Sequence, residues 1–355
     1  MSPRNRVPQH VNDGLLLPHV SIVVPTHDRP EMLSRLLESL SHLTYPRSQV
    51  ELIVVGGGHD RGRKVVEVFA ESAGFPVAYC VVPDDVNRSA SFKRNEGVRL
   101  ARGTILAFTD DDCVVHPGWI IAAVSLFRAP EVGGVEGAVE IPEPQRPTPT
   151  YRGSIRLSLP GGYQTCNMLY RKSVFEDCGG FDLSFPYYLE DTDLAFTVMD
   201  RGYTIIFAAT AVVSHPVQPG RPLKLLSIAR TVEQMPYLFV KHPRSKAILR
   251  ASMRPFNRSH YFYLALYAAA LLMALRDPSA GAVVVALGLC ILVTLHLAHD
   301  FWGLQFTSTE LVLTALCQPI VPVLRLYYWL KGFFRVRLAE RKHVRVGKRS
   351  AHPTN

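Results

Sequence analysis

Charged residues and paired cysteines are both scarce in this chain of 355 residues. Charged residues make up 19% of the sequence against 48% for apolar ones, and the mean hydropathy is +0.10. That balance excludes a disordered protein and a carrier built mainly from membrane helices. The six cysteines form no CxxC pair and have no regular spacing, so neither a disulfide scaffold nor a zinc module is expected.

Acidic residues are rare in the last third of the chain. Residues 1–220 carry 20 Lys and Arg against 25 Asp and Glu, a net charge of −5, whereas residues 221–355 carry 19 against 5, a net charge of +14. The net charge of +9 therefore combines a mildly acidic body with a strongly basic C-terminal part. Such a part suits either nucleic acid or an anionic membrane.

Two segments in this basic part have no charged residue. They are the 17 residues from Ser259 to Leu275 and the 21 residues from Ser279 to His299, separated by a short polar break. A helix of about 20 apolar residues can cross the hydrocarbon core of a bilayer. We expect a transmembrane hairpin over 259–299, and the alternative is a pair of buried helices in a soluble domain.

Basic residues flank the predicted hairpin on both sides, nine between Arg221 and Arg258 and eight between Lys331 and Arg349. Cytoplasmic flanks of membrane spans collect Lys and Arg, so both flanks are cytoplasmic if the number of spans is even. A third apolar run, Leu311 to Leu330, contains Arg325 and two prolines and continues into aromatics interleaved with cations. This pattern favours an amphipathic helix in the headgroup region, with a third span as the alternative.

These patterns divide the chain into six parts. The first 20 residues contain no apolar run typical of a secretory signal, so the body is expected in the cytoplasm, at the inner or plasma membrane of a multi-pass protein. The parts are an N-terminal extension (1–19), an α/β body (20–220), a basic juxtamembrane segment (221–258), the transmembrane hairpin (259–299), a third apolar or interfacial helix (308–340) and a basic tail (341–355).

Short apolar runs alternate with helical patterns in the body. Strands are expected at 21–25, 51–58, 77–83 and 104–110, with a helix over 31–40. Strands interleaved with helices predict a doubly wound, mostly parallel α/β sheet. Ligands of such sheets bind outside the carboxyl ends of the strands, which brings residues 25–29, 56–60 and 110–112 to one crevice.

Three consecutive carboxylates, Asp110, Asp111 and Asp112, follow one of these strands. Because side chains alternate along extended backbone, Asp110 and Asp112 are expected on the same side. Two carboxylates on one side suit Mg²⁺ or Mn²⁺, which a substrate diphosphate would also bind. The alternative is a solvated acidic turn.

A second acidic group, residues 190–193, opens an apolar-periodic helix. Carboxylates in the first turn of a helix often act only as caps. The functional interpretation makes Asp191 a general base fixed by the start of the helix, with Asp193 in a structural role.

Two further places carry candidate ligands. Lys93 and Arg94 could meet phosphate oxygens or simply form a solvated helix face. His215 follows the strand-like segment 211–214 and could be a third metal ligand or a packed histidine.

Together these segments resemble glycosyltransferase family 2, the inverting enzymes of the GT-A fold, in its membrane-associated bacterial type. The resemblance runs from about Val20 to His215 and rests on four motifs in the family's order. They are SIVVPTHDRPEMLSRLLESL, FKRNEGVRLARGTILAFTDDDCVVHPGW, NMLYRKSVFEDCGGFDLSF and LEDTDLAFTVMDRGYTIIF.

The resemblance implies a nucleoside diphosphate sugar donor and a divalent cation, Mg²⁺ or Mn²⁺. It places the metal-binding DxD motif on Asp110 and Asp112, with His215 as a further metal ligand, and makes Asp191 the general base that gives inversion. The implied donor-binding residues are Pro25, Thr26, Asp28, Asp60, Lys93, Arg94, Asp110 and Asp111. The sequence departs from the family at 56–58, where three glycines replace an acidic motif that meets the base, and Asp60 lies nearby.

The membrane segments and the basic tail suggest an acceptor that resides in the bilayer, either lipid-linked or an envelope glycan. With a polyprenyl phosphate acceptor no base is needed, and Asp191 would only orient the phosphate. A non-catalytic, nucleotide-sugar-binding membrane scaffold is the other alternative. Nucleic acid is not an expected partner, because the aromatic residues among the C-terminal cations lie on one apolar run.

Overall fold

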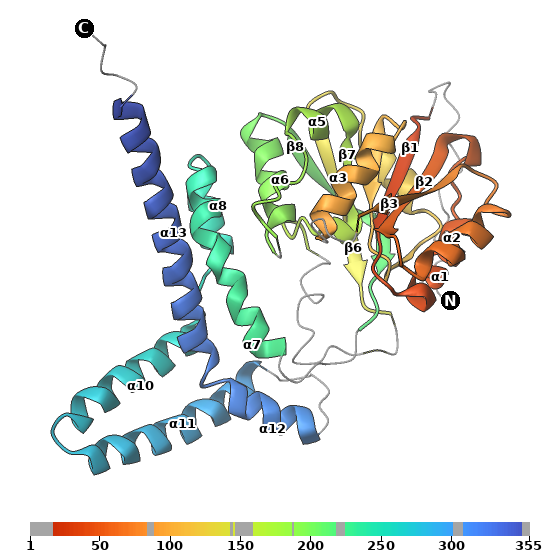
Figure 1. Ribbon diagram of the computed structural model, residues 1–355. Helices are drawn as coiled ribbons and strands as arrows, with labels where there is room; N and C mark the ends of the chain where they lie inside the picture. Colours follow the sequence, from red (N-terminus) through yellow and green to blue (C-terminus); the bar gives the residue numbers. More distant parts are fainter. Residues whose placement is uncertain are drawn as a thin grey trace, which may run out of the picture.

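The computed structural model describes residues 17–83, 89–142, 145, 159–186, 188–217, 224–300 and 308–349. Figure 1 shows an α/β domain on one side and long C-terminal helices on the other. Most of the extension 1–19 and the last six residues of the tail 341–355 lie outside the described residues.

Within the described residues, a single eight-stranded sheet forms the centre of the domain. Its strands lie in the order β3-β2-β1-β4-β7-β6-β8-β5. They span Val20–Pro25 (β1), Val50–Gly57 (β2), Val77–Val82 (β3), Ile105–Phe108 (β4), Val114–Val115 (β5), Val132–Glu140 (β6), Met168–Arg171 (β7) and Thr204–Ser214 (β8).

Helices cover both faces of this sheet. They are α1 (Pro30–Ser41), α2 (Gly62–Ala70), α3 (Ala90–Leu100), α4 (Trp119–Val124), α5 (Lys172–Asp177) and α6 (Glu190–Asp200). Ile22 and Val24 of β1 pack in one core with α1, α2 and α4, whereas Val23 packs in the other with α3, α5 and α6. A strand buried on both faces is mostly apolar, which explains the run from Ile22 to Val24, and the buried Ser21 donates a hydrogen bond to Glu51.

The doubly wound α/β architecture is therefore confirmed, but the sheet is parallel only in part. Strands β3, β2, β1 and β4 pair in parallel, as do β6 and β8. Strand β7 runs antiparallel to both β4 and β6, and β5 runs antiparallel to β8. The sheet is mixed because β7 is inserted in reverse between β4 and β6.

Strand β6 was not predicted from the sequence, because its glycines break the usual strand pattern. Gly137 is needed there because a Cβ would lie 2.3 Å from the side-chain amide of Asn167. That amide donates to the carbonyl oxygens of Ala138 and Ala211 and accepts from the indole of Trp119. Close packing at the centre of the sheet thus replaces strand propensity.

Short helices follow the α/β domain and pack against it. They are α7 (Lys224–Ile228), the 3₁₀ helix η4 (Ala229–Gln234), α8 (Met235–Lys241) and α9 (Lys246–Ser252). Leu238 and Phe239 of α8 share a third apolar core with Phe185, Leu189 and Phe196. The predicted basic juxtamembrane segment is thus largely a helical layer attached to the domain.

The predicted hairpin consists of α10 (Arg258–Ala274) and α11 (Pro278–Asp300), which pack against each other at the lower end of Figure 1. Among the described helices, only α11 is by itself long and apolar enough to cross a membrane. Helix α10 has 17 residues. The transmembrane hairpin therefore remains a prediction.

The third apolar run is divided into α12 (Ser308–Cys317) and α13 (Val321–Arg349), which are bent by 51° at a short break and together could form one more, broken span. Pro319 stands in this break and Pro322 in the first turn of α13, and both disfavour a helix that continues from α12. Helix α13 runs beside α8 in Figure 1. Trp329 of α13 packs against the third apolar core, so this helix lies partly on protein.

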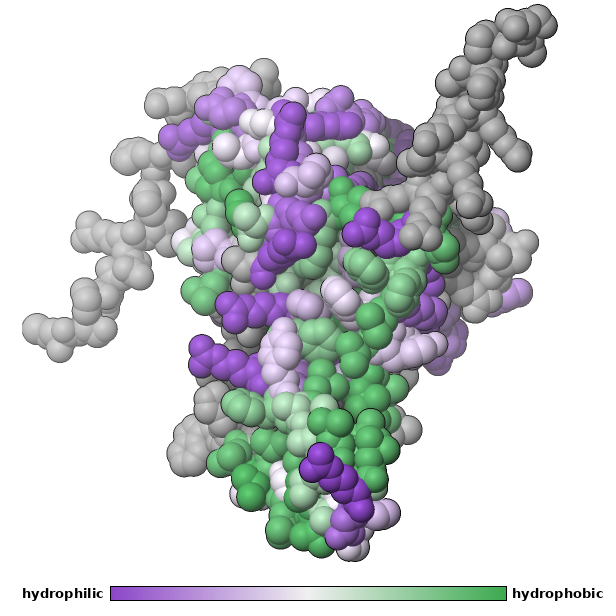
Figure 2. Space-filling view, turned by 90° about the vertical axis from the view of Figure 1, so that its left-hand side faces the viewer, coloured by the Kyte–Doolittle hydropathy of each residue, from purple (hydrophilic) through white to green (hydrophobic). Residues whose placement is uncertain are grey.

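The hydropathy of the surface changes along the molecule. Figure 2 shows a largely apolar surface at the end formed by α10 to α12, and a mixture of hydrophilic and apolar side chains above it. Leu271 and Leu272 on α10 and Leu287 and Leu295 on α11 are each 60–66% exposed. This end of the protein therefore leaves large side chains uncovered.

Candidate active site

A cleft of about 230 Å³ opens where the parallel half of the sheet ends. Its walls come from the loops after β1 and β4, the first two turns of α3 and the residue that follows β8. The lining residues are Pro25, Thr26, His27, Arg29, Ala90, Lys93, Arg94, Asp110, Asp111, Asp112 and His215. Eight of these were candidates from the sequence, so folding brings together residues up to 190 positions apart.

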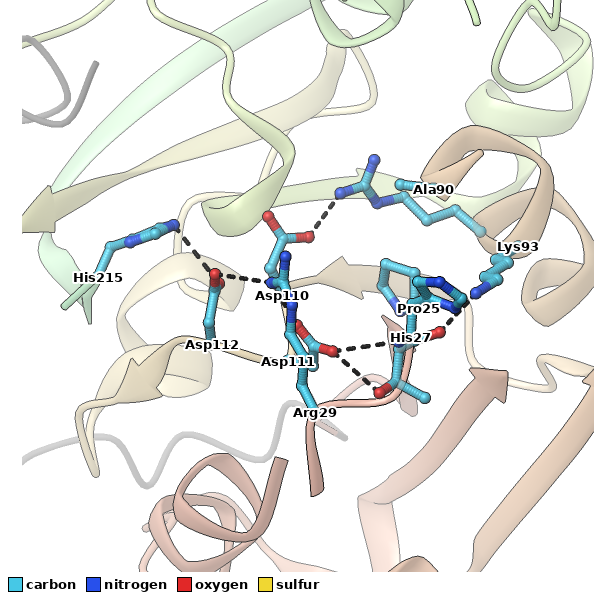
Figure 3. Close-up of a pocket in the computed structure, with 11 residues that line it drawn as sticks. Pro25, His27, Arg29, Ala90, Lys93, Asp110, Asp111, Asp112 and His215 are labelled. Carbon is cyan, nitrogen blue, oxygen red and sulfur yellow. Dashed lines mark hydrogen bonds and ion pairs between the residues drawn. The ribbon is translucent and has the colours of Figure 1, made fainter. Parts of the chain in front are cut away.

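The three consecutive aspartates contact different partners (Figure 3). Asp110 Oδ1 lies 2.5 Å from a guanidinium nitrogen of Arg94. Asp112 faces Nε2 of His215 at 3.5 Å, and Asp111 turns back toward the loop after β1. The three carboxylates therefore contact protein groups around one cleft and do not form a solvated acidic turn.

Asp111 is bound mainly by the β1 loop. Its carboxylate accepts hydrogen bonds from Oγ1 of Thr26 at 2.9 Å and from the backbone N–H of His27 at 3.4 Å. Arg29 donates to Asp111 at 3.3 Å and to Asp112 at 3.1 Å, although half of its side chain is exposed. Burial nevertheless raises the pKa of Asp111 to about 6. The middle aspartate thus ties β4 to β1.

Arg94 connects the aspartates to the start of α6. Its side chain is only 5% exposed and lies 3.6 Å from Glu190 in addition to its contact with Asp110. Burial alone would lower the pKa of Arg94, but the charges of Asp110 and Glu190 outweigh it and raise that pKa. Arg94 is therefore a fixed cation at the centre of the site.

Lys93 contacts the backbone of the β1 loop, whereas its neighbour Arg94 contacts carboxylates. Its ammonium group donates to the backbone carbonyl of Thr26 at 2.5 Å, and the residue is 3% exposed. The contact holds the end of β1, next to Pro25, against α3. Both predicted cations thus lie at the cleft, and neither forms a solvated helix face.

Asp28 and Asp60 lie beside the cleft and do not line it. Asp60 is buried and accepts from the backbone N–H groups of Asp28 and Gly62 at 3.0 and 2.8 Å. Asp28 itself is exposed, and its hydrogen bond from Arg61 at 2.7 Å lowers its pKa. A Cβ on Gly56 would lie 3.0 Å from Asp60 Oδ2, so the Asp60 carboxylate occupies space next to the glycines that replace the family's acidic motif.

Asp191 lies in the first turn of α6 and is only partly exposed. Its Oδ1 accepts from the backbone N–H of Thr192 at 2.7 Å. Burial raises the pKa of Asp191 to about 7, and the negative charge of Glu190 contributes. Leu189 precedes this turn with φ of 75° and is 2% exposed, so a strained backbone held by packing sets the direction of the helix start.

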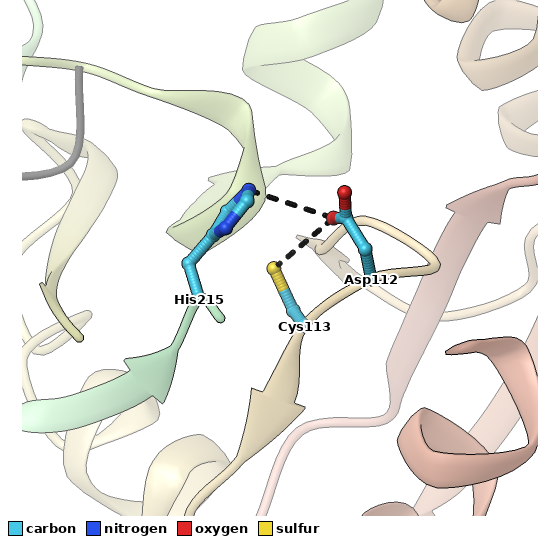
Figure 4. Close-up of side chains that lie close together, drawn as sticks. All are labelled: Asp112, Cys113 and His215. Carbon is cyan, nitrogen blue, oxygen red and sulfur yellow. Dashed lines mark hydrogen bonds and ion pairs between the residues drawn. The ribbon is translucent and has the colours of Figure 1, made fainter. Parts of the chain in front are cut away.

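The residues near Asp112 fit a hard divalent cation. Asp112, Cys113 and His215 bring one ligand atom each within 4.8 Å of one another (Figure 4). Burial raises the pKa of Asp112, and the charges of His215 and Arg29 offset this effect only in part, while the charge of Asp110 adds to it. A hydrogen bond with Cys166 and burial raise the pKa of Cys113 well above its usual range, so its sulfur stays a neutral thiol. Oxygen and imidazole ligands therefore fit Mg²⁺ or Mn²⁺ better than the sulfur does.

Four residues of the site were not named as individual candidates, although three of them lie in the segments 25–29 and 190–193 that the sequence indicated. His27, Arg29 and Ala90 line the cleft, and Glu190 contacts Arg94. His27 and Arg29 stand in the same loop as the candidates Thr26 and Asp28, which was the available signal. Their contact with the aspartates depends on the pairing of β1 with β4.

Residues 18–235 match the family described as "Glycosyltransferase like family 2". The match covers more than half of the chain, so the protein belongs to this family and is a glycosyltransferase.

Two curated relatives and one solved structure are similar to the chain. Glycosyltransferase AglE of Haloferax volcanii is 30% identical over 222 residues, covering 59% of this chain and 70% of that protein. Succinoglycan biosynthesis protein ExoM of Rhizobium meliloti is 31% identical over 216 residues, covering 57% and 68%. The mannosyltransferase PcManGT from Pyrobaculum calidifontis, solved in complex with GDP-Man and Mn²⁺, has a TM-score of 0.59 at 22% identity over 89% of this chain and 90% of that one. The fold of this chain is therefore GT-A-like.

Proposed function

We propose that the protein transfers a sugar from a nucleoside diphosphate sugar to a hydroxyl group of a lipid-linked or cell-envelope glycan, with inversion, at a membrane. The observation that carries the proposal is the link through Arg94, which contacts Asp110 at 2.5 Å and Glu190, the neighbour of Asp191, at 3.6 Å. The buried guanidinium of Arg94 thus connects the proposed donor-binding cleft to the segment that carries the candidate base.

The donor is proposed to lie across the cleft. Lys93 and Arg94 supply positive charge for a diphosphate, while Asp28 and Asp60 hold the nucleoside, with Asp60 in place of the missing acidic motif. Asp110, Asp112 and His215 would hold a divalent cation, which neutralises negative charge on the leaving diphosphate when it is bound. The mannosyltransferase with bound GDP-Man and Mn²⁺ supports this assignment by similarity of fold.

Asp191 is proposed to take the proton of the acceptor hydroxyl as its oxygen forms the new bond to the anomeric carbon. The bond from that carbon to the diphosphate breaks on the opposite face, which inverts the configuration. A base works best when its pKa is close to the working pH, and the pKa of Asp191 is raised to about 7. This value favours a hydroxyl acceptor over a polyprenyl phosphate, which needs no base.

The membrane assignment is supported by the uncovered apolar surface of α10 to α12 and by the cations that follow it. Helix α11 is proposed to cross the bilayer, together with α10 or the broken pair α12 and α13, with the α/β domain on the cytoplasmic side. Exposed Tyr327 and Phe334 on α13 stand among Lys and Arg side chains, as in helices that contact headgroups. The acceptor would then meet the cleft at the membrane surface.

Release of nucleoside diphosphate from a panel of sugar nucleotides tests the proposal. The full chain is purified in detergent and assayed with and without Mn²⁺ as wild type, Asp112→Ala and Asp177→Ala. Asp177 pairs with Arg201 on the surface and serves as the matched control. We expect Mn²⁺-dependent release that Asp112→Ala abolishes and Asp177→Ala retains.

The opposite result is also informative. If no sugar nucleotide is hydrolysed or bound by the wild type, the proposed donor chemistry is wrong. A non-catalytic scaffold would bind a sugar nucleotide without releasing nucleoside diphosphate. Equilibrium binding of the same sugar nucleotides therefore distinguishes a scaffold from a glycosyltransferase.

A further inference from the structure

Two cations at the end of α8 lie among three carboxylates of the α/β domain, one buried and two partly exposed. The Lys241 ammonium lies 2.6 Å from Asp182 Oδ2 and 2.8 Å from Asp193 Oδ2. His242 Nε2 lies 2.9 Å from Asp193 Oδ1, and its Nδ1 lies 2.7 Å from Asp200 Oδ2. One lysine and one histidine thus serve three carboxylates, which we call the α6–α8 clamp.

The clamp holds α6 at both ends. Asp193 is in the first turn of this helix, and its side chain is 2% exposed, so it has little access to water. Asp200 is the last residue of α6 and also accepts from Oγ of Ser245 at 2.8 Å. Displacement of α8 would therefore leave a buried carboxylate at one end of α6 and a half-buried one at the other.

Both cations of the clamp are in their charged forms. Carboxylates only accept hydrogen bonds, so each ring nitrogen of His242 must donate and the ring is an imidazolium. Burial alone would lower the pKa of Lys241 and of His242, but hydrogen bonds to the carboxylates outweigh it and raise both.

The clamp acts on the segment that carries the candidate base. Asp191 precedes Asp193 by two residues in the same turn of α6. Leu189, whose strained backbone begins this turn, packs in one apolar core with Leu238 and Phe239 of α8. Helix α8 thus fixes the start of α6 by charge on one side and by packing on the other.

We propose that Lys241 and His242 are positioning residues for sugar transfer, which hold α6 so that Asp191 keeps its orientation at the cleft. The inference rests on the proposed function, since it takes Asp191 as the base. Both cations lie beyond residue 235, where the match to the family ends. The C-terminal helices therefore contribute to catalysis as well as to attachment.

The test compares Lys241→Met, His242→Gln and the conservative Lys241→Arg in the full chain. The kcat and KM for nucleoside diphosphate release are measured with the best sugar nucleotide of the panel, and GDP and UDP binding reports on folding. We expect kcat to fall at least about tenfold in Lys241→Met and His242→Gln with KM nearly unchanged, because a base displaced by a fraction of an ångström loses much of its effect. Lys241→Arg should recover most of kcat, since arginine can also bridge two carboxylates.

Lys64→Met is the matched control, because the Lys64 side chain is 81% exposed on α2. Unchanged kcat in Lys241→Met and His242→Gln would overturn the inference. A parallel loss of kcat and nucleotide binding would also overturn it, because the clamp would then support the fold in general. Asp191→Asn separates the failure of this inference from the failure of the proposed function. If Asp191→Asn releases nucleoside diphosphate at the wild-type rate, Asp191 is not the base. If Asp191→Asn is inactive while Lys241→Met keeps the wild-type rate, Asp191 remains the base and only the role of the α6–α8 clamp is wrong.

Discussion

The parallel half of the sheet and the α10–α11 hairpin use the same apolar residues in opposite ways. Ile22, Val23 and Val24 of β1 are 0% exposed, whereas Leu272 of α10 and Leu287 of α11 are 66% and 62% exposed. The first region finds its apolar surroundings within the chain. The second leaves large apolar side chains uncovered, and in the proposed function a bilayer would cover them.

The two regions are joined through η4 and α13. Glu233 of η4 lies 3.1 Å from Lys331 and 2.7 Å from Arg335 on α13, and its pKa is lowered because these cations outweigh its burial. Gly332 allows this approach, since a Cβ there would clash with the backbone carbonyl of Glu233. The comparison therefore teaches that the candidate active site and the uncovered apolar helices are separate surfaces on one connected framework.

The largest expected effect lies wholly within the first region. Asp191→Asn should lower transfer by about a thousandfold, within the range for loss of a general base. Co-sedimentation with membranes should not change, because Asp191 is distant in sequence from α10 to α13. Normal transfer by this variant, measured with the natural donor, would mean that the two regions do not divide the functions in this way.

The second prediction compares the same substitution, leucine to alanine, in the two regions. Leu52→Ala in β2 should lower the free energy of unfolding by about 2–5 kcal/mol, because Leu52 is 0% exposed and a cavity remains. Leu287→Ala in α11 should change it by no more than about 0.5 kcal/mol in detergent. Thermal unfolding of both variants measures the difference, and equal losses would show that α11 is packed like a core helix.

A charge placed in the hairpin should break attachment. Leu287→Arg puts a cation on the most apolar helix, at a cost of about 2.5–3.5 kcal/mol for the centre of a span. Cell fractionation should then show the protein shifted from the membrane pellet to the soluble fraction. Leu100→Arg, at a leucine that is 49% exposed on α3, is the matched control and should leave the distribution unchanged.

The smallest expected effect is on the pH dependence of the rate. Because burial raises the pKa of Asp191 to about 7, the basic carboxylate is lost as the pH falls through that value. The kcat should therefore fall about tenfold between pH 8 and pH 6. Glu190→Gln should move the midpoint to lower pH, since the Glu190 charge contributes to raising this pKa. A flat profile over this range would argue for a phosphate acceptor.

Much of the fold was predictable, because apolar runs report burial directly. The strands after Val20 and Val50 and the helix over 31–40 agree with β1, β2 and α1 to within a residue or so. The antiparallel strand β7 and the glycine-rich β6 were missed, since their stability comes from side chains that arrive from elsewhere. Asn167, which packs over Gly137, is one of them.

The candidate site was predictable where it follows a strand. Asp110, Asp111 and Asp112 could be placed at a carboxyl edge from the sequence, because the run before them is apolar and short. The partners of these aspartates could not be predicted, because Arg94, Thr26 and His215 reach them only through strand pairing and helix packing.

The sequence by itself determined the α/β class, the family and the position of the aspartates, because these depend on local patterns of apolar and charged residues. The tertiary structure alone decided that the sheet is mixed, that Arg94 joins Asp110 to the start of α6, and that Lys241 and His242 hold that helix. Contacts of this kind depend on burial and on the approach of distant segments, and a linear pattern does not encode either one.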